Sequence, residues 1–116
     1  RSRMVLELGG NDPIIVMEDA DVDEASTLAV QGSYKNSGQR CTAVKRMLVH
    51  QSVADQFVEQ VLAKSKAWSY GDPSDKTLDM GTVIDEAAAM FFESRVNEAA
   101  RRAETASAVT QALDAV

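Results

Sequence analysis

The sequence predicts an α/β fold in which a mostly parallel sheet is flanked by helices. Continuous apolar runs, typical of strands covered on both faces, alternate along the chain with segments whose apolar residues recur at helical spacing. The chain has 116 residues, of which 45% are hydrophobic and 26% charged. Its size and composition therefore suit a single globular core.

Three strands are expected. Met4 to Leu8 is a short β-favourable run that ends at Gly9-Gly10. After a turn at Asn11-Asp12-Pro13, Ile14 to Met17 is apolar without alternation, which suits a strand covered on both faces. Val44 to His50 is the third expected strand.

Three helices are expected as well. Asp21 and Glu24 are spaced like a capping box, so a helix should follow and end at Asn36-Ser37-Gly38, where Gly38 is free to take a positive φ. Ser52 is the expected N-cap of a second helix that reaches about Lys66. The third helix should run from Asp85 to about Glu104.

Charge and hydropathy exclude several classes of partner. The net charge is −6 and the sequence has no basic stripe, so nucleic-acid binding is not expected. No apolar run approaches the roughly 18 residues that span a bilayer, and no signal-peptide pattern opens the chain. Because a single cysteine suits a reducing compartment, we expect a cytoplasmic protein without a membrane partner.

No metal site is expected. Asp19, Asp21 and Asp23 mimic the opening of a calcium loop, but Glu24 stands where that loop needs glycine. They are better explained as charges at a helix N-terminus. The only histidine, His50, has no partner at ligand spacing.

Two short motifs contain residues suited to thiol chemistry. Leu6-Glu7-Leu8-Gly9-Gly10 contains a carboxylate, and Gly38-Gln39-Arg40-Cys41-Thr42 contains the only cysteine, 34 residues after Glu7. Composition alone favours an inert, buried thiol and a solvent-facing glutamate. In this order and spacing, however, the two motifs resemble the aldehyde dehydrogenase superfamily. Gly71-Asp72-Pro73 and the segment from Met80 to Asp85 extend the likeness over roughly Met4 to Ala103.

The resemblance implies a part of the aldehyde dehydrogenase catalytic domain and a role for each motif. Cys41 would be the nucleophile that attacks an aldehyde carbonyl, with its own backbone N–H helping to hold the oxyanion. Glu7 would be the general base that activates water for hydrolysis of the resulting thioester. Leu8 and Gly9 would lie against the nicotinamide of NAD or NADP.

Arg40 and Thr42 flank the expected nucleophile and bear on the substrate. A guanidinium binds phosphate-like groups bidentately, and a hydroxyl adds a donor, so an anionic aldehyde is a reasonable substrate. The segment from Gly38 to Arg46 is similar to members that oxidise phosphonoacetaldehyde and to non-phosphorylating glyceraldehyde-3-phosphate dehydrogenases. The alternative is that Arg40 pairs with a structural carboxylate, and both readings stay open.

The resemblance also implies that much of the enzyme lies elsewhere. The dinucleotide-binding domain of the family precedes the glutamate motif, so we expect residues 1–104 to be a partial catalytic domain that is inactive alone. Residues 105–116 form an Ala-rich tail that cannot be aligned. The full-length protein would be a homodimer or homotetramer. Two other readings remain, a non-catalytic oligomerisation or interaction module and a thiol-reactive domain without turnover.

Overall fold

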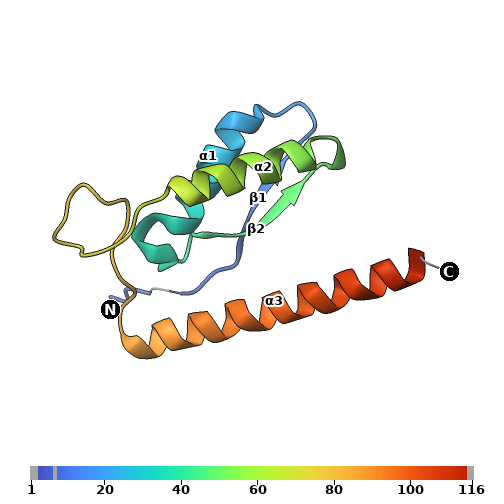
Figure 1. Ribbon diagram of the computed structural model, residues 1–116. Helices are drawn as coiled ribbons and strands as arrows, with labels where there is room; N and C mark the ends of the chain where they lie inside the picture. The colour runs from blue at the N-terminus through green and yellow to red at the C-terminus, as the bar shows by residue number, and fades with distance from the viewer. Residues whose placement is uncertain (1–2, 7, 115–116) are drawn as a thin grey trace. The chain divides into compact units, whose positions relative to one another are not determined.

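The chain divides into two compact units, residues 1–82 and residues 83–116 (Figure 1). The computed structural model describes residues 3–6 and 8–114, and side chains as far as residue 103. Along the chain the elements are β1, α1, a 3-10 turn (η1), β2, α2 and α3. The predicted α/β class is confirmed, with strands and helices alternating through the first unit.

The sheet of the first unit has two parallel strands. β1 (Asp12–Val16) pairs with β2 (Val44–Val49), so that Ile14 lies opposite Met47 and Val16 opposite Val49. A register irregularity between Asp12 and Pro13 precedes the regular ladder. Parallel strands need a long crossover, and here α1 supplies it.

Two helices complete this unit and bury its core. α1 (Val22–Tyr34) and α2 (Gln51–Ala67) pack on each other and contact the strands (Figure 1). The core cluster joins a strand to both helices and consists of Val16, Val22, Ala29 and Phe57. The small Ala29 is fully buried in this cluster.

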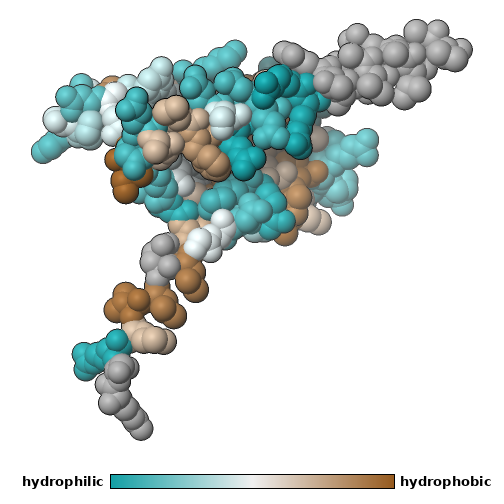
Figure 2. Space-filling model, turned by 90° about the horizontal axis from the view of Figure 1, so that it is seen from below, coloured by the Kyte–Doolittle hydropathy of each residue, from teal (hydrophilic) through white to brown (hydrophobic). Residues whose placement is uncertain are grey.

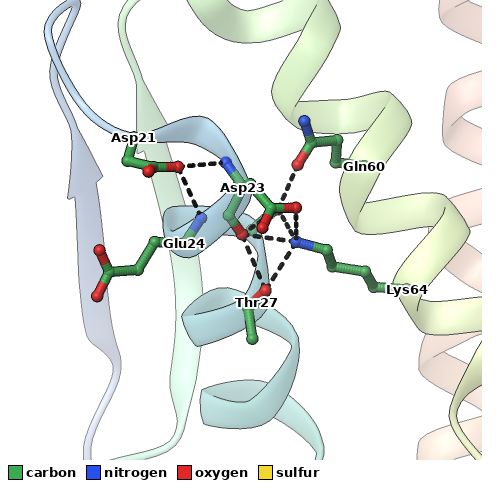
Figure 3. A network of polar contacts seen from close by, with 7 residues as sticks. Asp21, Asp23, Glu24, Thr27, Gln60 and Lys64 are labelled. Carbon is green, nitrogen blue, oxygen red and sulfur yellow. Dashed lines mark hydrogen bonds and ion pairs between the residues drawn. The ribbon is translucent and has the colours of Figure 1, made fainter.

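A polar network also joins α1 to α2 (Figure 3). Lys64 Nζ lies 2.6 Å from the carbonyl oxygen of Asp23, 2.9 Å from Asp23 Oδ1, 2.8 Å from Ser26 Oγ and 2.7 Å from Thr27 Oγ1. Ser26 is fully buried, and its hydroxyl also contacts Gln60 Oε1 at 2.9 Å. Because buried polar groups are costly when unpaired, this network fixes how the two helices align.

The outer face of the sheet is apolar and uncovered in this unit. Ile15 is 64% exposed, Met17 56% and Leu48 52%, whereas Val16, between Ile15 and Met17, is buried. These residues line a shallow groove that ends at His50. A continuous apolar run was expected to be covered on both faces, and only one face is covered within the described residues.

The segment that precedes β1 differs from its prediction. Residues 3–6 and 8–11 form no regular secondary structure, so the strand expected at Met4 to Leu8 is wrong for its described residues. A strand needs a partner to satisfy its backbone, and no strand among the described residues pairs with this segment. Its apolar side chains are exposed, Val5 by 97% and Leu8 by 70%, and they stand out as brown atoms in Figure 2.

Most other element boundaries are close to those expected, and the exceptions are the N-cap of α2 and the end of the third helix, at Asp114 instead of about Glu104. Asp21 is the N-cap of α1, as predicted, because its Oδ1 accepts from the N–H groups of Asp23 and Glu24 at 3.0 Å. For α2, the expected N-cap Ser52 is wrong. The helix begins at Gln51, two residues earlier than a cap at Ser52 would place it, and His50 is the cap, with Nδ1 accepting from the N–H of Ser52 at 3.3 Å.

The second unit consists of α3 (Glu86–Asp114). Asp85 Oδ1 accepts from the N–H of Ala88 at 2.7 Å and so caps the predicted third helix. On the surface of α3, Glu98 forms ion pairs with Arg95 and Arg102. The helix continues past residue 104, where the sequence predicts a domain boundary. In the described part of the chain, no helix combines the length and apolarity required to cross a bilayer.

Candidate active site

Cys41 lies in the loop between η1 (Lys35–Gly38) and β2, and it is exposed. The chain reaches this loop through three consecutive left-handed residues, with φ of 57° at Asn36, 55° at Ser37 and 72° at Gly38. Only Gly38 was expected to take a positive φ. Asn tolerates this conformation, but Ser adopts it at some cost, and its hydroxyl bonds the carbonyl oxygen of Gly81 at 2.9 Å.

The loop around Cys41 is held by its own backbone and by a lysine. The N–H of Arg40 donates to Gly38 at 2.9 Å, and the N–H of Ala43 donates to Arg40 at 3.1 Å. Lys45 Nζ lies 3.2 Å from the carbonyl oxygens of Arg40, Cys41 and Ala43. Cys41, the candidate nucleophile, is therefore exposed on a loop whose carbonyl groups are held by Lys45.

The glycines of the first motif approach this loop closely. A Cβ placed on Gly10 would lie 2.5 Å from the carbonyl oxygen of Cys41, a distance that real side chains do not reach. The parallel pairing of β1 with β2 explains the approach, because both motifs directly precede paired strands. Arg46 reinforces it by donating from Nε and Nη2 to the carbonyl oxygen of Asn11 at 3.1 and 2.9 Å. The two sequence motifs thus meet in space.

Glu7, the expected general base, lies outside the described residues. Leu8 and Gly9, the expected nicotinamide contacts, are described and exposed. No atom lies within 4 Å of a Cβ built on Gly9. An exposed leucine next to unobstructed backbone fits the flat face of a nicotinamide ring. These two residues offer no charged group for the phosphates of a dinucleotide.

The side chains of Arg40 and Thr42, the expected substrate contacts, have different surroundings. Arg40 turns to α1, where Nη2 donates to the carbonyl oxygen of Gly32 at 3.0 Å, and its Nε is buried without a partner among the described residues. Arg40 therefore caps the C-terminal turn of the helix and keeps an unused donor. Thr42 is exposed beside Cys41. Its hydroxyl makes no hydrogen bond within the described part of the chain.

Sequence reasoning missed three contributors to this arrangement. Lys45 and Arg46 were placed in a strand and in the segment shared with relatives, and Gly10 was expected to let the backbone approach a ligand, but none of the three was expected to contact the Cys41 loop. The signal for the basic pair was weak, since a charge within a strand usually faces solvent. Among the described residues, no group of three or more His, Cys, Asp or Glu side chains is placed to bind a metal ion.

Comparison with known proteins places this geometry in context. The sequence pattern of the aldehyde dehydrogenase family matches residues 1–112. An NADP-dependent glyceraldehyde-3-phosphate dehydrogenase from Pisum sativum is 46% identical over 100 residues, which are 86% of this chain and 20% of that protein. A succinate-semialdehyde dehydrogenase [NADP(+)] from Mycobacterium leprae is 44% identical over 96 residues, 83% of this chain and 21% of that protein. The chain thus spans about a fifth of the length of these relatives.

A solved structure agrees with the sequence comparison. The structure of 3,6-anhydro-L-galactose dehydrogenase superposes with a TM-score of 0.78 at 41% identity, over 83% of this chain and 20% of that one. On these grounds the chain belongs to the aldehyde dehydrogenase family.

Proposed function

We propose that this chain carries the nucleophile and the general base of an NAD(P)-dependent aldehyde dehydrogenase, which oxidises an aldehyde to a carboxylate. The observation that carries the proposal is the contact between the two motifs. Gly10 lies against the carbonyl oxygen of the exposed Cys41, so the glycine end of the first motif adjoins the loop that carries the thiol. Family membership supplies the reaction class.

In the proposed first half-reaction, the Cys41 thiolate forms a bond to the carbonyl carbon, and the carbonyl π electrons move to oxygen. The backbone N–H of Cys41 stabilises this oxyanion. A bound nicotinamide would supply the hydride acceptor, so that the hydrogen on this carbon could leave as hydride while the carbonyl re-forms. Cys41 is then joined to the acyl group as a thioester. Leu8 and Gly9 line the part of the site where the nicotinamide ring would lie.

In the proposed second half-reaction, Glu7 takes a proton from water as the water oxygen bonds to the thioester carbon. The carbon–sulfur bond then breaks, releasing the carboxylate product and the Cys41 thiolate. The exposure of Cys41 supports this step, because water needs access to the thioester. The chemistry requires no metal.

The cofactor would be held largely by other parts of the protein. This chain spans about a fifth of its relatives, and the described residues around Leu8 offer no phosphate-binding loop. We therefore propose that the isolated chain does not oxidise aldehydes. The NADP in the names of the two relatives supports NADP over NAD.

We further propose an aldehyde that bears an anionic group, such as a phosphate, phosphonate or carboxylate. Glyceraldehyde-3-phosphate and succinate semialdehyde, named for the two relatives, both carry one. Thr42 has an exposed hydroxyl next to Cys41, whereas Arg40 would have to turn away from α1 to present its guanidinium, because its Nε is buried. In the complete enzyme, Arg40→Ala should raise KM for an anionic aldehyde far more than for a neutral one, and an equal rise would contradict this assignment.

The thioester half of the mechanism can be tested on the chain itself, because an activated ester delivers the acyl group without a cofactor. With 4-nitrophenyl acetate, intact-mass measurement should detect one acetyl group, and Cys41→Ser should abolish it. Glu7→Gln should slow release of the acetyl group without preventing its addition, whereas the control Glu18→Gln should change neither rate. Acetylation that persists in Cys41→Ser, or equal release from the Glu7→Gln and unmodified chains, would contradict the proposal.

A second candidate function is self-association through the outer sheet face. The observation in its favour is the uncovered apolar surface of Ile15, Met17 and Leu48. A homo-oligomer would bury these side chains, which are costly to leave in water. Sedimentation should then show a dimer or larger species that Leu48→Glu dissociates. A well-folded monomer at micromolar concentration would exclude this candidate.

A further inference from the structure

The side chain of Lys45 serves the loop of Cys41 rather than the sheet. Lys45 lies on β2, but its Nζ is 3.2 Å from each of three carbonyl oxygens, those of Arg40, Cys41 and Ala43. A lysine ammonium has three protons to donate. The three acceptors therefore use its full donor capacity, and all three belong to one loop.

These bonds determine where the N–H of Cys41 points. The carbonyl of Arg40 and the N–H of Cys41 belong to the same peptide unit, which is planar and trans, so the two groups point in opposite directions. The carbonyl oxygen of Arg40 is held by Lys45 at 3.2 Å and by the N–H of Ala43 at 3.1 Å. Fixing this oxygen turns the N–H of Cys41 away from Lys45.

The N–H of Cys41 is also left available for a ligand. Among the hydrogen bonds between described residues, none is donated by this N–H. Withdrawal of electron density from the Arg40 carbonyl by a cation strengthens the N–H of the same peptide as a donor, because hydrogen bonds in a chain polarise one another. A free, oriented and polarised N–H next to a nucleophile is what oxyanion stabilisation requires.

We infer that Lys45 is a positioning residue that orients the backbone N–H of Cys41 toward the developing oxyanion. The inference rests on the proposed function, in which this N–H stabilises the tetrahedral intermediate. Lys45 touches no reacting atom and acts only through the peptide between Arg40 and Cys41. Two simpler roles give different expectations, namely that Lys45 only keeps the loop folded or only favours the thiolate.

Two reagents distinguish these roles in the 116-residue chain, which has one cysteine. Acetylation by 4-nitrophenyl acetate passes through an oxyanion, whereas alkylation by iodoacetamide displaces iodide at a saturated carbon and forms none. Both rates would be measured by intact mass for the unmodified chain and for Lys45→Met, Lys45→Arg and Lys76→Met. Lys76→Met is the matched control, because it removes the same charge from an exposed loop residue.

We expect Lys45→Met to slow acetylation at least about tenfold, since loss of a whole oxyanion donor costs about 10²- to 10³-fold. Alkylation should change less than about twofold, because it needs no such donor. Lys45→Arg, which keeps the charge and the donors, should recover most of the acetylation rate, and Lys76→Met should change neither rate. Circular dichroism would verify that the variants keep their helices.

Three results would overturn the inference. Equal slowing of both reactions would assign Lys45 to loop folding or to the thiolate, and unchanged acetylation in Lys45→Met would leave it without a role. In both cases the proposed role of Cys41 would stand. An unmodified chain that is alkylated at Cys41 but never acetylated would instead refute the proposed function, and the inference with it.

Discussion

The backbone of Gly10 lies so close to the carbonyl oxygen of Cys41 that a Cβ at residue 10 would come within 2.5 Å of it. The two residues are 31 positions apart in the sequence. Each precedes one strand of a parallel pair, and the pairing of β1 with β2 brings them together. A glycine is needed here for close approach and not for an unusual φ, since Gly38 is the only described glycine with a positive φ.

Substitution of the two adjacent glycines should have unequal effects. Gly10→Ala should lower the free energy of unfolding by about 1–3 kcal/mol, because the new methyl group forces the two segments apart. Gly9→Ala should change it by less than about 0.5 kcal/mol, because nothing lies within 4 Å of a Cβ at residue 9. Urea denaturation measures both values. Equal losses would mean that residue 10 does not touch the Cys41 loop.

Removal of the Lys64 ammonium should loosen the contact between α1 and α2. Lys64→Met keeps the aliphatic stem but removes the ammonium donor to the oxygen of the buried Ser26 hydroxyl, at an expected cost of about 1–3 kcal/mol. Lys66→Met, an exposed residue on the same helix, should cost less than about 0.5 kcal/mol. Thermal unfolding of the pair would decide, and similar melting temperatures would contradict a stabilising network.

The cap of α2 can be assigned by two alanine substitutions. His50→Ala should destabilise the chain by about 0.5–2 kcal/mol, because it removes the Nδ1 acceptor of the Ser52 N–H. Ser52→Ala removes only the hydroxyl and should cost less than about 0.5 kcal/mol. His50→Asn should preserve stability, since Asn is a preferred N-cap. A larger loss in Ser52→Ala than in His50→Ala, measured by denaturant unfolding, would restore Ser52 as the cap.

The loop that follows α2 should lose order in acid. The N–H of Ser69 and its hydroxyl both donate to the Asp79 carboxylate at 2.8 Å. These two bonds, the N–H first and the hydroxyl to a smaller extent, hold the pKa of Asp79 below its ordinary value of 3.8. A carboxyl group with a lowered pKa in the folded state stabilises that state above its ordinary pKa, and the stabilisation is lost as the pH falls through the lowered value. Protonation of Asp79 should therefore release Ser69 only below about pH 3.8.

The amide proton shift of Ser69 during an acid titration measures this release. Asp79→Asn should make the shift insensitive to pH, because an amide oxygen still accepts a hydrogen bond but does not titrate in this range. Asp72, whose pKa is lowered by the N–H of Ser74 and then by its side chain, provides a second example in the same loop. An Asp79 midpoint at or above the ordinary value would refute the prediction.

Local signals in the sequence were sufficient for much of the first unit. Asp21 predicted the start of α1, because a cap depends on residues within one helical turn. The continuous run that begins at Ile14 predicted a strand, and the stop signal at Asn36-Ser37-Gly38 predicted that a helix ends before Cys41. The expected strand at Met4 to Leu8 failed, since strand propensity without a partner leaves the backbone unpaired.

The sequence by itself determined the family, the helix end that precedes Cys41 and the alternation of strands with helices, because each depends on neighbouring residues. Only the tertiary structure decided that Gly10 meets Cys41, that Arg40 turns to Gly32 and that Lys45 holds the loop carbonyls. The contact of Gly10 with Cys41 depends on strand register, and the contacts of Arg40 and Lys45 depend on the direction that each side chain takes. These contacts leave no periodic signal in the sequence, because the partners meet only in the folded chain.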